Sequence, residues 1–277
     1  MLELLRELFS YSFIVRALMV GVMVALVSAL LGVSLVLKRY SMIGDGLSHV
    51  GFASLAIAMA LGLAPLQVSI PVVVLAAFLL LRISENSKIK GDAAIALISS
   101  SSLAIGVIMV AMTTGMNTDV CNYMFGSILA MRISDVYLSI VLSLMVLILY
   151  VMFYNKIFAI TFDESFARAT GIKAGRYNML IALLTALTIV IGMRMMGALL
   201  ISSLIIFPAL TSMRVFGSFK SVVICSAILS VCCFFIGIAA SFAFSVPAGA
   251  SVVAINILAF VTCTIIGLIK KNMGVLA

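Results

Sequence analysis

Three observations predict an all-α fold for this sequence. The predicted fold is a polytopic bundle of about eight or nine transmembrane helices, which forms a single domain over residues 1–277. Of the 277 residues, 65% are hydrophobic and only 9% are charged, whereas a soluble domain is about half apolar and a quarter charged. The mean hydropathy is +1.37. The apolar residues form runs of about 20 residues, the length of a spanning helix. A soluble enzyme, a nucleic-acid-binding protein and a disordered linker are therefore excluded as descriptions of the whole chain.

The apolar runs predict helices rather than strands, because open sheet edges do not survive in lipid and barrel strands are shorter and alternate in polarity. Residues 1–10 carry three charged residues among leucines, a pattern typical of a short amphipathic helix at the membrane interface. Nine spans are expected near residues 12–36, 46–64, 66–82, 93–114, 134–154, 178–193, 196–213, 221–242 and 250–269.

The basic residues predict the orientation. One set of loops holds Lys38, Arg39, Arg82, Lys88, Lys90, Lys156, Arg168, Lys173, Arg176, Arg214, Lys220, Lys270 and Lys271, and the opposite set holds Arg6, Arg16, Arg132 and Arg194. The larger set is cytoplasmic by the positive-inside rule. The C-terminus is then inside, and nine spans place the N-terminus outside. A re-entrant run at 66–82 or 178–193 would place the N-terminus inside instead.

The longest cytoplasmic loop, residues 155–177, has a mixed amphipathic pattern. Asp163 can cap a helix whose first turn holds Glu164, and Gly171 can end that helix. A short capped helix on the cytoplasmic face is suited to docking a soluble partner. A plain connector is the alternative.

One acidic residue and the only histidine of the chain stand together at the beginning of an apolar run. Asp45 and His49 are four residues apart, so on a helix they share a face about 6 Å apart along the axis. A carboxylate and an imidazole suit a divalent transition metal, and Gly44, Gly46 and Gly51 allow close helix approach. The alternative is an N-capping aspartate beside a hydrogen-bonded histidine. One chain offers two ligands, and two copies across a dimer axis would offer four.

The absence of two sequence motifs excludes some classes of function. There is no G-x-x-x-x-G-K-[ST] sequence, so the chain does not bind ATP through a P-loop, and no H-E-x-x-H sequence of a zinc protease. An intramembrane hydrolase would need a second catalytic carboxylate or a base facing a serine, and Ser48 points about 100° away from its neighbour His49 on a helix. A passive channel is a further alternative. We expect no enzyme activity and no permanently bound cofactor.

Five segments, in order along the chain, resemble the zinc/manganese permeases of bacterial ABC importers. The segment LKRYSMIGDGLSHVGFASLAIA is similar to their early motif, and YMFGSILA (Tyr123 to Ala130) is similar to a segment of their zinc branch. The loop TFDESFARATGIKA resembles their coupling loop. GALLISSLIIFPALTSMR and VPAGASVV match their late spans.

The resemblance implies the compact vitamin-B12-permease-like fold of type II ABC importers in the bacterial cytoplasmic membrane. The implied partners are a second permease copy, ATP-binding cassette ATPase subunits and an extracytoplasmic metal-binding protein; no nucleic acid is expected. By motif position, Asp45 and His49 coordinate the transported ion. The resemblance also implies that the coupling loop binds the ATPase. By motif position, this loop contains Asp163, Glu164, Ala169 and Gly171.

The resemblance also bears on the choice of ion. Some relatives, especially of the manganese type, carry a proline soon after the histidine, where this chain has Val50-Gly51-Phe52-Ala53. Two aspartates and two histidines suit tetrahedral zinc better than six-coordinate manganese. The expected cargo is therefore Zn²⁺, with manganese or iron as the alternative.

Overall fold

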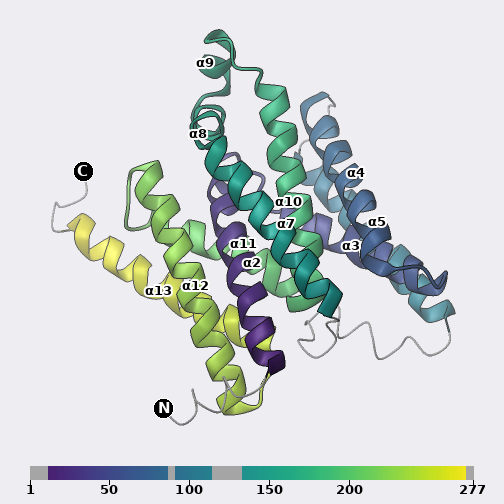
Figure 1. Ribbon diagram of the computed structural model, residues 1–277. Helices are drawn as coiled ribbons and strands as arrows, with labels where there is room; N and C mark the ends of the chain where they lie inside the picture. The colour runs from purple at the N-terminus through teal and green to yellow at the C-terminus, as the bar shows by residue number, and fades with distance from the viewer. Residues whose placement is uncertain (1–11, 87–90, 114–132, 273–277) are drawn as a thin grey trace.

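The computed structural model describes residues 12–86, 91–113 and 133–272, and these residues form helices joined by short turns (Figure 1). The prediction of an amphipathic helix at residues 1–10 lies outside the described residues, as does the segment Tyr123 to Ala130. The helices are α2 (Ser12–Leu37), α3 (Ile43–Ala60), α4 (Pro65–Asn86), α5 (Gly91–Met112), α7 (Ile133–Met152), α8 (Tyr154–Phe162), α9 (Glu164–Ala169), α10 (Ala174–Met196), α11 (Ala198–Met213), α12 (Phe219–Phe244) and α13 (Ala248–Asn272).

The predicted spans correspond in order to α2, α3, α4, α5, α7, α10, α11, α12 and α13, with every boundary within four residues of its prediction. Eight of these helices are long and apolar enough to cross a membrane. The exception, α11, has 16 residues, about 24 Å of helix against a hydrocarbon core of about 30 Å. Its turn from α10 at Gly197 has a φ of 83°. Met196 lies beside that turn and packs against Gly21 of α2. Gly21 lies about 13 Å along the helix axis from Ser12, the first residue of α2.

Helices α2, α3 and α10 form the interior of the bundle, whereas α5 and α13 are mostly exposed on its outside. In Figure 1, α3, α4 and α5 lie on one side of α2 and α10, and α12 and α13 lie on the other. Small residues let the backbones meet: Gly32 lies against the Ile205 carbonyl of α11, and Gly237 against the backbone of Val252 on α13. Because lipid supplies no hydrophobic force between helices, such close approach stabilises a membrane bundle.

One end of the bundle, which we call the basic end, collects the described residues of the larger basic set. Lys38 follows α2 and contacts Glu164 of α9, Arg82 of α4 shares a pocket with Arg176 of α10, and the ring of Phe219 packs on α8. Figure 1 shows α8 and α9 at the top and the beginning of α2 at the bottom. By the positive-inside rule, the basic end faces the cytoplasm.

The central loop holds two helices where the sequence predicts one. Only Phe153 separates α7 from α8, and α8 buries Ile157 and Ile160 against the bundle. Asp163 is extended, with φ −146° and ψ 97°, so it ends α8 and caps α9. The sequence-based prediction missed α8, because the apolar residues of this helix were assigned to the connecting loop 155–177.

Candidate functional site

Other helices pack against three sides of α3, and glycines allow close contact on two of these sides. On one side Gly46 lies against Ile95 of α5. On another side Gly44 lies against α11 and Gly51 lies against α10. On the third side, Ser54 donates a hydrogen bond to Ser69 of α4 over 2.9 Å. The predicted role of these glycines in close helix approach is therefore confirmed.

The remaining side of α3 carries Asp45 and His49. At about 100° per residue, these two positions fall between the directions of Gly44 and Gly46. Their side chains are 43% and 19% exposed, respectively, although most of α3 is buried. The described helices thus leave the Asp45 side chain nearly half exposed, whereas the His49 side chain on the same side of α3 is mostly covered.

The two side chains lie one helical turn apart, at a distance that leaves room for an ion. His49 Nε2 is 3.6 Å from Asp45 Oδ2, which is longer than an ordinary hydrogen bond. Two donors that each bind Zn²⁺ at about 2.1 Å in tetrahedral geometry are about 3.4 Å apart. The pair can therefore supply one oxygen and one nitrogen to the same ion with little movement.

The described part of this chain supplies no third ligand. Within residues 12–86, 91–113 and 133–272, no group of three or more His, Cys, Asp or Glu residues could hold a metal. Ser48 is fully buried, and its hydroxyl donates to the Gly44 carbonyl over 2.7 Å. A hydrolase that pairs Ser48 with His49 does not fit this geometry.

Helix α9 is capped as the sequence predicts. The Asp163 side chain accepts a hydrogen bond from the Phe166 backbone N–H over 2.9 Å. Gly171 follows the helix with a φ of 86°, a conformation that favours glycine. Ala169 and Gly171 are exposed on the basic end. The predicted role in docking of Asp163, Glu164, Ala169 and Gly171 stays a prediction.

Glu164, the first residue of α9, is held by three polar side chains. Its carboxylate accepts hydrogen bonds from Arg168, on the next turn, over 2.6 Å, from Lys38 over 3.2 Å and from Asn178 over 3.2 Å. Burial raises the pKa of the Glu164 carboxyl, but the hydrogen bonds from Asn178, Arg168 and Lys38 and the charge of Lys38 outweigh burial and hold the pKa below its usual value. Glu164 is therefore ionised at neutral pH.

Two residues of this region, Phe166 and Lys38, were not predicted from the sequence to have a role at the site. Phe166 on α9 is 65% exposed, while its neighbour Ala167 is fully buried, so α9 rests on Ala167 and presents an aromatic ring outward. An aromatic residue between Glu164 and Arg168 in a helix with a predicted cap is the sequence signal that would have found it. Lys38 gave no such signal, because a lysine between two spans only indicates the cytoplasmic side.

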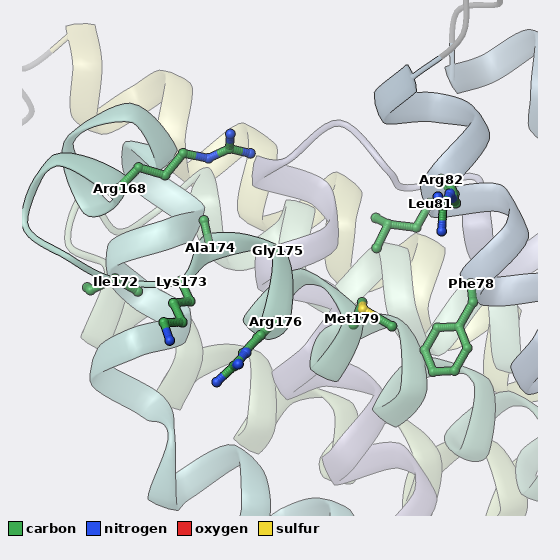
Figure 2. A pocket seen from close by; sticks show the side chains of 10 residues that line it. All are labelled: Phe78, Leu81, Arg82, Arg168, Ile172, Lys173, Ala174, Gly175, Arg176 and Met179. Carbon is green, nitrogen blue, oxygen red and sulfur yellow. The ribbon is translucent and has the colours of Figure 1, made fainter.

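A cationic pocket of about 610 Å³ opens beside α9. Figure 2 shows Arg82 and Phe78 on the α4 wall, and Lys173 and Arg176 near the beginning of α10. Among the described residues that line it, four are basic and none is acidic. The pocket adds to the positive potential of the basic end and attracts anionic groups.

An apolar helix bundle with an ionisable pair inside a span and a capped helix at its basic end is the architecture of a multi-pass membrane protein, and such a pair inside a span is typical of transport proteins. The model of the family described as the ABC 3 transport family matches residues 10–267. The chain belongs to this family, whose members are membrane components of ABC transporters.

Named relatives and a solved structure agree with this assignment. The chain is 30% identical to the manganese import system permease protein ScaB of Streptococcus gordonii over 258 residues, which cover 93% of this chain and 92% of the relative. It is 30% identical to the high-affinity zinc uptake system membrane protein ZnuB of Haemophilus influenzae over 246 residues, which cover 88% and 94%. The structure of PsaBC from Streptococcus pneumoniae in complex with Fab matches with a TM-score of 0.84, at 30% identity and 94% coverage of both chains. The predicted type II importer fold is confirmed.

Proposed function

We propose that this chain is the permease subunit of an ABC importer that moves a divalent transition-metal ion, most favourably Zn²⁺, into the cytoplasm. The observation that carries the proposal is the Asp45–His49 pair on the partly exposed side of α3. An ionisable group inside a span costs about 2.5–3.5 kcal/mol or more, so such groups face a cavity or a partner rather than lipid.

A second copy of the chain completes the site in this proposal. Two donors do not fill the tetrahedral shell of Zn²⁺. A two-fold axis beside this partly exposed side of α3 supplies two carboxylates and two imidazoles. Such a site holds the ion while it passes and releases it toward the cytoplasm, as conduction requires.

Energy for transport comes from a separate ATPase in this proposal, because the sequence has no P-loop. The exposed Phe166 on the capped helix α9 is suited to fill a hydrophobic groove of that subunit. An extracytoplasmic metal-binding protein delivers the ion at the opposite end.

Two ions compete for the role of cargo. Equal numbers of carboxylate and imidazole donors favour Zn²⁺. Manganese is the second candidate, because the Streptococcus gordonii relative is named as a manganese import permease.

Uptake into proteoliposomes that hold the permease, its ATPase and the binding protein tests the proposal. We expect ATP-dependent uptake of zinc, with manganese as a weaker competitor. Preferred uptake of manganese would reassign the cargo, and absence of uptake of any divalent metal would refute the function.

A further inference from the structure

We propose that Lys38 is a positioning residue that connects the docking helix α9 to the Asp45–His49 pair, so that movement of α9 is transmitted to α3. This inference rests on the proposed function. Lys38 lies in the turn between α2 and α3, whereas α9 begins 126 residues later.

The Lys38 ammonium group joins three other helices. Its side chain is 11% exposed. It donates to Glu164 Oε2 of α9 over 3.2 Å, to Asn178 Oδ1 of α10 over 2.5 Å and to the Ile160 carbonyl of α8 over 3.4 Å. Three donor positions thus meet three acceptors from three elements, which satisfies the ammonium group away from water.

Burial makes the connection costly to break. A buried charge that loses its partner remains without water or counter-charge, which is strongly unfavourable. Asn178, only 5% exposed, also donates to Glu164. Lys38 and Glu164 are therefore expected to move together when an ATPase displaces α9.

The chain between Lys38 and α3 is short and internally hydrogen-bonded. The Tyr40 N–H donates to Leu35 over 2.8 Å and the Arg39 N–H to Val36 over 3.0 Å, with Arg39 at φ 62°. These bonds form a Schellman motif at the end of α2. The Ile43 N–H then donates to the Tyr40 carbonyl over 3.0 Å, which ties the motif to the first residue of α3.

Asp45 follows two residues later, in the first turn of α3. A displacement of Lys38 therefore reaches the metal pair through a segment with few free torsions. Sequence position gives no sign of this connection, because Lys38 and Glu164 meet only in the folded chain.

Lys38→Met tests the inference in the assembled transporter, because it keeps the apolar stem and removes the ammonium group. We expect the metal transported per ATP hydrolysed to fall about tenfold, a typical coupling strength between sites. Equilibrium binding of zinc should not change, because Asp45 and His49 remain. Lys220→Met is the matched control: Lys220 is exposed on the basic end, and its loss should leave the ratio unchanged.

The outcomes separate transmission from other roles. Unchanged transport per ATP in Lys38→Met would overturn the inference, and so would loss of ATPase assembly, which would show a docking role instead. If Lys38→Met does not fold, Glu164→Gln removes the counter-charge, and an unchanged ratio there would also overturn it. Failure of the wild-type complex to move any metal would count against the proposed function, not against this connection.

Discussion

Asp45 and His49 show which residues can be assigned from sequence alone. An acidic residue and a lone histidine at one helical spacing stand out because charge is rare in apolar runs. The structure adds that other helices cover three sides of α3 and that this side stays partly exposed. Lys38 could not be assigned in this way, because its partners come from α8, α9 and α10.

Removing either donor of the pair tests its role. In Asp45→Ala and His49→Ala we expect metal uptake to be abolished, because each change removes two of the four ligands of the proposed dimer site. Measured uptake in proteoliposomes, with ATPase assembly verified by size-exclusion chromatography, checks this. Normal uptake by both variants would show that the ion takes another path.

Arg39 holds a left-handed backbone conformation that is unfavourable for a side chain with a Cβ atom. Arg39→Gly should stabilise the protein by about 0.5–1 kcal/mol, because glycine adopts positive φ without that strain. Gly171→Ala should have the opposite sign, because Gly171 has a φ of 86°. Thermal unfolding in detergent measures both. A lower melting temperature for Arg39→Gly would disprove the strain at this turn.

At the scale of elements, hydrophobic run length predicted eight long helices and the shorter α11 well, because lipid requires each span to be a helix. It predicted α8 poorly. The apolar residues of α8 lie outside the spans, and nothing local shows that Ile157 and Ile160 are buried against other helices.

The cap of α9 should determine how often this helix opens. Asp163→Ala removes the bond to the Phe166 N–H, at a cost of about 1 kcal/mol. We expect faster hydrogen exchange of α9 amides at neutral pH. Ser165→Ala, an exposed change in the same helix, is the control. Equal exchange in both variants would mean that packing alone holds α9.

The attachment of α9 should weaken in acid. The pKa of Glu164 is below its ordinary value of 4.5, so its contribution to stability is complete above pH 4.5 and is lost as the pH falls through the lower folded value. The chain has no tryptophan, so Phe166→Trp gives α9 a unique fluorescent probe. Its emission should change in that acid range, and Glu164→Gln should remove this change. A transition that persists in Glu164→Gln would assign the acid effect to another group.

At the scale of the whole molecule, the apolar composition predicted a membrane bundle, because such a bundle depends on totals rather than on particular contacts. The asymmetry of basic residues predicts its orientation in the same way, and that orientation stays a prediction. The proposed dimer contact and the choice of ion were harder to predict, because both depend on a surface shared by two chains.

The number of zinc ions bound per chain, measured by equilibrium dialysis of the purified permease–ATPase complex, tests the shared metal site most directly. We expect one zinc for every two permease chains, and loss of that zinc in Asp45→Ala and in His49→Ala. One zinc per chain, or zinc retained in both variants, would contradict a site formed by two copies.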